Sequence, residues 1–141
     1  MKRLAAGFMV VMVFAAFTTS AQEKETPYWY VSSYKVPWAK TDSLKTLVTM
    51  YTNPIVAQAK KMGRILDYHL LIHHTGGEYN VVIMVKYPSW TAIGKGAGFA
   101  DAFKVIESNE AKRNAAIGSF NWVFEGSGSV HMDNIYTEAT Q

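Results

Sequence analysis

The stretch that decides the fold is LDYHLLIHHTGGEYNVVIMVKY, which runs from Leu66 to Tyr87. Two apolar segments flank the pair Gly76–Gly77, and such a glycine pair is typical of a two-residue turn between antiparallel strands. Pairing across this turn gathers aliphatic and aromatic side chains on one face. Its pairs are Tyr68–Val85, Leu70–Ile83 and Ile72–Val81. Because a shift of one residue would mix the two faces, the sequence predicts a β-hairpin over 66–75 and 78–87.

The other face of this hairpin mixes charged, polar and apolar groups. Its pairs are Asp67–Lys86, His69–Met84, Leu71–Val82 and His73–Asn80. The first pair is complementary in charge, which favours this register. The aliphatic side chains and the methionine are too apolar to stay wholly in water. We therefore expect another layer of protein over this face.

Segments on both sides of the hairpin complete the pattern of the fold. Aromatic and β-branched residues predict a strand over Tyr28–Val36. Apolar residues at helical spacing predict a helix that starts at Thr41 or Asp42, kinks at Pro54 and ends before Gly63.

The chain after the hairpin repeats this pattern. It predicts a short helical turn capped by Ser89, a second helix that breaks near Ser108–Asn109, and a last strand over Val130–Thr137. The order strand–helix–strand–strand–helix–strand is that of the ferredoxin-like plait. The predicted fold class is therefore α+β: a four-stranded antiparallel sheet in the order 4-1-3-2, with both helices on one face and the other face open.

Residues 1–21 have the pattern of a secretory signal. Lys2 and Arg3 precede fourteen apolar or small residues, and further small residues lead to Ala21. Such a run forms a helix about 21 Å long, which is shorter than the ~30 Å hydrocarbon core of a membrane. We expect cleavage after Ala21 and a secreted or periplasmic chain, with an uncleaved anchor as the alternative. Residues 22–27 then form a flexible lead-in, and 28–141 a single domain.

Composition excludes several kinds of site and partner. The chain has no cysteine, so it has no disulfide, no thiolate nucleophile and no cysteine-bound zinc. Its 14 basic and 11 acidic residues leave the mature chain near +1 once Lys2 and Arg3 are removed. Because nucleic-acid binding needs a concentrated basic surface, we expect no nucleic-acid partner. We also expect no membrane contact after signal cleavage.

Two junctions of the chain resemble those of dimeric α+β barrel domains. They are YKVPWAKTDSL, from Tyr34 to Leu44, and YPSW, from Tyr87 to Trp90. Members of that superfamily pair their open sheet faces into a barrel and include small-molecule monooxygenases, haem-degrading enzymes, cyclases and isomerases. The resemblance covers nearly all of the mature chain. It implies a homodimer with a pocket in the barrel interior and leaves the reaction type open.

The haem-degrading members of that superfamily use an asparagine on the first strand, a tryptophan, and a histidine on the second helix that binds iron. Ser32 stands near the position of the asparagine, and no histidine lies between Tyr87 and Val130. We therefore expect no haem and no other cofactor. We also expect no metal site, because His69 and His73 lie ~13 Å apart along one strand.

The candidate catalytic residues are His69, His131 and Asp133. His131 and Asp133 share one face of the last strand, so the carboxylate can orient an imidazole that acts as general base or acid. His69 lies on the open face of the second strand. In the order 4-1-3-2 these two strands are opposite edges, ~14 Å apart within one chain, so the histidines approach one another only across a dimer. The alternative is that these side chains simply face water.

Candidate ligand contacts lie on the central strand and on the open face. Tyr30, Ser32 and Tyr34 share one face of the first strand and offer hydroxyl groups; aromatic packing in the core is the alternative for such residues. The full set is Tyr30, Ser32, Tyr34, Leu71, His73, Val82 and Met84.

The sequence thus predicts a secreted homodimeric α+β barrel that binds a small apolar or aromatic molecule in its interior. Cofactor-free monooxygenase, cyclase or isomerase-type chemistry is one version of this function. A non-catalytic binding or interaction module, with a packed barrel interior, is the alternative.

Overall fold

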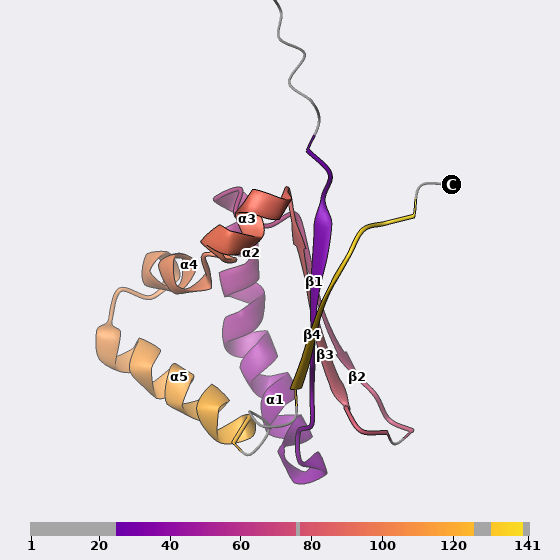
Figure 1. Ribbon diagram of the computed structural model, residues 1–141. Coiled ribbons are helices and arrows are strands. Elements are labelled where there is room, and N and C mark those ends of the chain that lie inside the picture. The colour runs from indigo at the N-terminus through magenta and orange to yellow at the C-terminus, as the bar shows by residue number, and fades with distance from the viewer. Residues whose placement is uncertain (1–24, 76, 126–130, 140–141) are drawn as a thin grey trace, which may run out of the picture.

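The computed structural model describes residues 25–75, 77–125 and 131–139. Four strands form one antiparallel sheet in the order β2-β3-β1-β4. They are β1 (Tyr28–Tyr34), β2 (Asp67–Ile72), β3 (Val81–Tyr87) and β4 (His131–Tyr136). The helices lie together on one side of the sheet and leave the other side open (Figure 1). The predicted ferredoxin-like α+β fold and its strand order are confirmed.

Five α-helices are found in the described part of the chain. They are α1 (Thr41–Leu47), α2 (Asn53–Lys61), α3 (Trp90–Lys95), α4 (Phe99–Ile106) and α5 (Glu110–Val123). Ser89 caps α3 as predicted, because its Oγ accepts a hydrogen bond from the Ala92 amide at 3.2 Å. The predicted break near Ser108–Asn109 is also confirmed, and the Asn109 side chain caps α5.

The segment between α1 and α2 differs from the single kinked helix that the sequence predicts. Val48–Thr52 forms a π-helical turn, in which the Asn53 amide bonds to the Val48 carbonyl five residues earlier. The cause is Pro54, which has no amide hydrogen and whose ring would clash with the carbonyl of Met50 in a regular helix. The wider turn lets the chain pass this position without breaking, and Gly63 (φ +67°) then ends the helical region as predicted.

The central hairpin has the predicted register. Asp67 pairs with Lys86, and Leu71 pairs with Val82. The strands are shorter than predicted, although the His73 amide still donates to the Asn80 carbonyl at 2.8 Å beyond their ends. The predicted turn includes Gly76, which lies outside the described residues.

Strand β1 ends two residues before the predicted Val36. The Asn80 side chain replaces a neighbouring strand as the partner of the Val36 backbone. Its Oδ1 accepts from the Val36 amide and its Nδ2 donates to the Val36 carbonyl, both at 2.7 Å. Asn80 is only 3% exposed, so this paired bond satisfies backbone groups that would otherwise be buried without partners.

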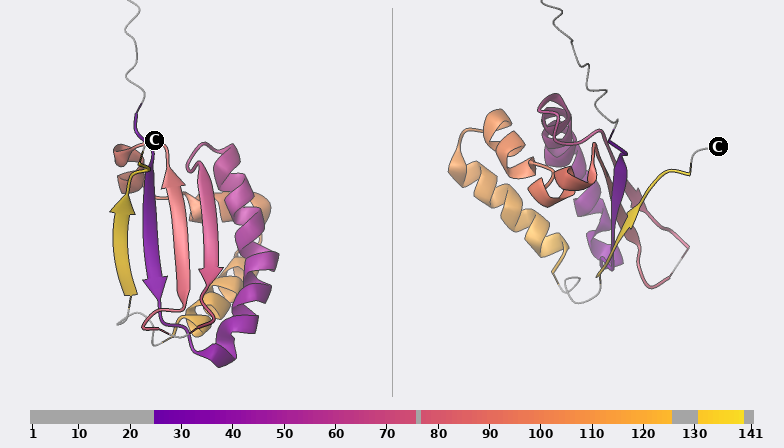
Figure 2. Two further views of the ribbon diagram at one scale, coloured as in Figure 1. Left: turned by 90° about the vertical axis from the view of Figure 1, so that its right-hand side faces the viewer. Right: turned by 45° about the horizontal axis from the view of Figure 1, so that its top comes forward.

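The core lies between the helices and the central strands. One cluster joins α2 and α4 to β3 through residues such as Ala59, Phe103 and Val85, and a second joins α1 and α5 to β3 through Leu44, Val123 and Val81. Edge strand β4 is different, since all of its residues except Asn134 are exposed. In Figure 2 the left-hand view looks onto the open face, where no helix lies in front of the strands.

Several predictions concern residues that the structure does not describe. The predicted signal at 1–21, the first half of the lead-in (22–24), and Val130 lie outside the described residues. Within the described ranges, no helix is both long and apolar enough to cross a membrane.

Candidate functional site

The helix side of β1 and β4 brings five of the predicted site residues together. Ser32 pairs with Asp133, and Tyr34 pairs with His131, so these side chains share the face that also carries Tyr30. We call Tyr30, Ser32, Tyr34, His131 and Asp133 the edge cluster. Ser32 is 7% exposed, whereas His131 and Asp133 are exposed on the edge strand.

The polar atoms of the edge cluster contact one another. The Asp133 carboxylate interacts with the Tyr30 phenol, and its Oδ2 lies 3.6 Å from the His131 Nε2. The His131 ring stacks on Tyr34 with centroids 5.7 Å apart. Burial, together with the bond to Asp133 and its negative charge, raises the pKa of Tyr30 above its ordinary value. The carboxylate thus sits between a neutral phenol and an imidazole, which is a geometry suited to proton transfer.

An apolar cavity, partly open to the outside, lies deeper on the same side of the sheet. It has a volume of about 220 Å³ and is lined by the π-helical turn, α2, α4, α5 and the strands β2 and β3. Its lining residues are Thr52, Ile55, Val56, Tyr68, Ile83, Phe99 and Phe120. Only Thr52 and Tyr68 bring polar groups to this lining.

Tyr68 is the polar side chain whose properties this cavity changes most. Burial raises the pKa of Tyr68 to about 12, so the phenol stays neutral and keeps its proton at physiological pH. Its ring packs edge-on against Phe99 with centroids 6.0 Å apart. Tyr68 therefore offers a hydrogen-bond donor held in a fixed place in an apolar space.

The cavity and the edge cluster both lie next to the same cluster of core residues. Tyr30, Tyr68, Ile83 and Phe99 all pack against the same core cluster of α2, α4 and β3. Ile83 also pairs with Ser32 across β1 and β3. A molecule in the cavity is therefore separated from the edge cluster by the width of the central strands.

The open face carries the remaining predicted residues. Register places His69, Leu71, Val82 and Met84 on this side. His69 stacks on Trp29 with centroids 5.5 Å apart, and its Nε2 lies 3.4 Å from the Asp67 Oδ2. Lys60 is the main cause of a lowered pKa at Asp67, since its Nζ lies 2.6 Å from the carboxylate. These groups form a polar rim at one end of the open face.

The rest of the open face is apolar and exposed. Leu71 is 53% exposed, Met132 46% and Tyr136 51%, and Val31, Val82 and Met84 lie half-buried between them. We call these six residues the open-face patch. A sheet face with this many exposed or half-buried apolar side chains is unusual on a monomer.

The structure does not bring His69 and His131 together within one chain. His69 pairs with Met84, which pairs with Val31, and Val31 pairs with Asn134. Neighbours across strands share a face and residues alternate along a strand, so His131 lies on the face opposite His69. The two histidines have to be treated as parts of separate sites.

His73 lies beyond the end of β2, in the loop. Its Nε2 is 2.6 Å from the Thr75 Oγ1, and its side chain is exposed. His73 thus joins neither the edge cluster nor the cavity. Among the described residues, no group of three or more histidine and acidic side chains is arranged to hold a metal ion.

Sequence reasoning missed most of the cavity. Thr52, Phe99 and Phe120 come from three separate helical segments, and only their meeting in space makes a lining. The sequence did carry one signal, because Pro54 disturbs the first helix next to Thr52 and such π-helical turns often occur at functional sites.

Comparisons with known proteins place the fold and leave the activity open. No protein-family model matches this sequence, and no curated protein matches it. A conserved protein from Methanosarcina mazei has 14% identity and a TM-score of 0.51, over 82% of this chain and 96% of that one. A proposed antibiotic biosynthesis monooxygenase from Caulobacter crescentus has 19% identity and a TM-score of 0.53, over 83% of this chain and 93% of that one.

A NIPSNAP family protein from Agrobacterium tumefaciens is similar to the same extent. It has 16% identity and a TM-score of 0.51, over 82% of this chain and 88% of that one. At such identities the likeness concerns the fold alone. The predicted ferredoxin-like α+β fold is confirmed, and function has to be argued from this chain's own residues.

Proposed function

We propose that the mature chain is a secreted homodimer that pairs through its open-face patch and binds a small apolar or aromatic molecule on the helix side of the sheet. The cavity of about 220 Å³ is the observation that carries the ligand part of this proposal. The sequence placed the ligand in the barrel interior. We place it behind the sheet because the second copy would fill the interior.

The open-face patch supports the homodimer. Leu71, Met132 and Tyr136 are each about half exposed, and fully burying an aliphatic side chain of this size stabilises by about 1.5–3 kcal/mol. A second copy brings the same patch and so provides an apolar surface of the same kind. The polar rim around Asp67 and His69 stays at the margin, where charged pairs remain solvated.

The size and lining of the cavity define the ligand. An apolar cavity of about 150 Å³ holds a benzene molecule, so about 220 Å³ suits one or two fused rings. The aromatic and aliphatic walls favour an apolar body. The neutral Tyr68 phenol and the Thr52 hydroxyl favour a single hydrogen-bonding group on it.

The secretory pattern at residues 1–21 supports the location. When the full chain is expressed in a bacterium, the protein is expected outside the cytoplasm with Gln22 as its first residue. Intact-mass measurement of the purified protein checks this, and retention of residues 1–21 would contradict it.

A planar alcohol tests the ligand part directly. We expect 2-naphthol to bind the mature protein, as followed by its fluorescence. Ile83→Trp should abolish binding because the larger side chain fills the cavity that Ile83 lines. Ile135→Trp is the matched control, since Ile135 lies 39% exposed on β4 outside the cavity lining. Equal binding by both variants would place the molecule elsewhere.

The edge cluster favours a second candidate function, proton transfer on a small molecule held at the edge cluster itself. The Asp133 carboxylate contacts both the Tyr30 phenol and the His131 ring, and no cofactor is needed for removing an acidic C–H proton. The enolisable ketone 2-tetralone in D₂O tests this. We expect deuterium to enter its activated CH₂ positions faster with the protein than without it, and His131→Asn to remove the difference. Unchanged exchange would leave binding as the function.

A further inference from the structure

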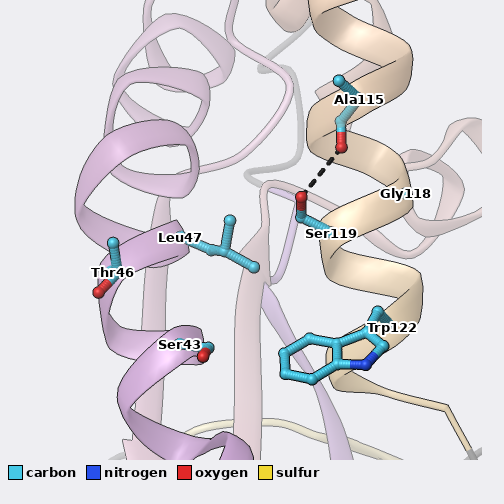
Figure 3. A pocket seen from close by; sticks show the side chains of 7 residues that line it. All are labelled: Ser43, Thr46, Leu47, Ala115, Gly118, Ser119 and Trp122. Carbon is cyan, nitrogen blue, oxygen red and sulfur yellow. Dashed lines mark hydrogen bonds between the residues drawn. The ribbon is translucent and has the colours of Figure 1, made fainter.

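A groove on the outer side of the helical layer belongs to neither the cavity nor the edge cluster. It has a volume of about 530 Å³ and runs between α1 and α5. Its lining residues are Ser43, Thr46, Leu47, Ala115, Gly118, Ser119 and Trp122, none of which lines the apolar cavity. Figure 3 shows Leu47 and Trp122 reaching across it from the two helices, with Ser43 beside the indole.

The Trp122 indole forms a fixed, exposed platform in this groove. Trp122 is 50% exposed, yet Lys40 anchors it: the Lys40 ammonium lies 4.6 Å from the ring centroid and donates to the Trp122 carbonyl. An ion pair between Lys40 and Glu125, at 3.6 Å, holds the ammonium in turn. An aromatic ring kept in place in this way costs little conformational entropy when a ligand stacks on it.

Hydroxyl oxygens from both helices line the groove around this platform. Ser119 donates its proton to the Ala115 carbonyl at 3.0 Å, which leaves the Ser119 oxygen with lone pairs for a donor from outside. The Ser43 hydroxyl makes no hydrogen bond to any described residue and so can both donate and accept. A ligand that satisfies this lining therefore has to bring several hydroxyl donors and acceptors of its own.

The charges around the groove favour a neutral ligand. No lining residue is charged. Charged side chains next to the lining form pairs, Lys45 with Asp42 at 2.9 Å and Lys40 with Glu125. An anion or a cation would therefore find no free counter-charge in the groove.

We propose that this groove binds a neutral carbohydrate, with the C–H face of one sugar ring on the Trp122 indole and its hydroxyls on Ser43 and Ser119. A sugar ring combines one apolar face with hydroxyl groups around its rim, which matches an indole surrounded by serine oxygens. A purely apolar ring would cover the indole and strip water from the serine oxygens without replacing their hydrogen bonds.

Gly118 allows the groove to be closed without disturbing the fold. A Cβ added at Gly118 meets no atom within 4 Å, and replacing a glycine inside a helix favours the helix. Gly118→Leu should therefore fill the groove while the protein stays folded. Gly94→Leu is the matched control, since Gly94 lies in α3 with the same free space and far from this lining.

Ligand-observed NMR titration of the mature protein with maltose, cellobiose and N,N′-diacetylchitobiose tests the proposal. We expect at least one of them to bind with a dissociation constant of about 1 mM. Trp122→Ala and Gly118→Leu should each weaken that binding at least about tenfold. Gly94→Leu should keep it, and so should Trp38→Ala, which removes an equally exposed tryptophan outside the groove.

Three results would overturn this proposal. One is no binding of any of the three disaccharides up to about 50 mM. Another is equal or tighter binding of 2-naphthol or glucose 6-phosphate at Trp122. The third is loss of the dimer in Trp122→Ala, measured by light scattering, because the groove would then be an interface between copies. Since the groove and the cavity share no lining residue, the two binding results do not depend on the proposed ligand site. The third result rests on the proposed homodimer.

Discussion

The two faces of the sheet both carry apolar residues and differ in what covers them. On β3, Val81 and Val85 face the helices and are 0% and 5% exposed, while Val82 and Met84 between them face the open side. Strands that are apolar at both odd and even positions are typical of sheets buried on both sides. This sheet is therefore composed for two covering layers, and one chain supplies only one of them.

The comparison also separates two kinds of site. The helix-covered face holds the cavity and the edge cluster, where burial changes the pKa of Tyr68 and Tyr30. The open face holds the open-face patch with a charged rim. The difference teaches that the alternation of side chains along each strand places the cavity with the edge cluster and the open-face patch on opposite sides of one sheet.

A charge introduced into the open-face patch should have the largest effect on assembly and stability. Leu71→Asp places a carboxylate in the middle of the open-face patch, and in a symmetric dimer both copies bring one. Burying such charges costs several kcal/mol, so we expect dissociation or unfolding. Light scattering at micromolar concentration measures this. Val105→Asp is the control, because Val105 is 63% exposed on α4 away from the sheet face. A monomeric unaltered protein would refute the pairing itself.

The burial of Tyr68 on the helix-covered face should make the folded protein less stable at alkaline pH. Tyr68 holds its proton up to a pKa of about 12 in the folded protein, whereas in the unfolded chain its pKa is ~10. Between these values the unfolded state loses the proton first, so stability falls as pH rises, by about 2.7 kcal/mol over the whole window. Below pH ~10 there is no such effect.

Urea unfolding at pH 8 and pH 11 measures this loss. We expect Tyr68→Phe to lose about 1.4 kcal/mol less than the unaltered protein between these two pH values. Tyr136→Phe, on the open face and 51% exposed, should behave like the unaltered protein. Identical losses in both variants would show that the Tyr68 ring is not buried.

The sequence was sufficient for the hairpin and for the order of the strands. The glycine pair and the alternation of side chains between the two faces predict the register of β2 and β3, because the two strands are close in the chain. The same local signals carry no information on how β1 pairs with β4, which is more than a hundred residues away in sequence for Trp29 and Tyr136. Only the pairing of β1 with β4 shows that His131 faces the helices. The sequence therefore could not predict that His69 and His131 lie on opposite faces of the sheet.

Other features depend on side chains that meet across the fold. Asn80 ends β1 through a side-chain bond to Val36, and nothing in the neighbourhood of Asn80 in the sequence signals this partner. The cavity needs Phe99 and Phe120 to converge from separate helices. The contact between two of the catalytic candidates, in contrast, could be predicted from the sequence. His131 and Asp133 are two residues apart on one strand and do contact one another.

A smaller effect should distinguish the polar group from the walls of the cavity. Tyr68→Phe keeps the ring and removes the hydroxyl, and one hydrogen bond contributes about 1 kcal/mol. We expect 2-naphthol to bind about fivefold more weakly and naphthalene to bind with unchanged affinity. Fluorescence titration of both ligands measures the difference. Equal weakening of both would mean that Tyr68 acts only through packing.

The smallest expected effect concerns the edge cluster, at the margin between the two faces. Burial is the main cause of the raised pKa of Tyr30, and the hydrogen bond to Asp133 and its charge raise it further. Asp133→Asn removes the charge and leaves the burial, so the pKa of Tyr30 should move down towards its ordinary value without reaching it. Ultraviolet titration of tyrosinate, taken as the difference from Tyr30→Phe, measures this. Asp101→Asn is the control. Asp101 lies on α4 outside the edge cluster, and its Oδ2 is 3.8 Å from the Arg64 guanidinium. If Asp133→Asn leaves the pKa of Tyr30 unchanged, the phenol and the carboxylate are not hydrogen-bonded in solution, and the proton-transfer candidate loses its geometric basis.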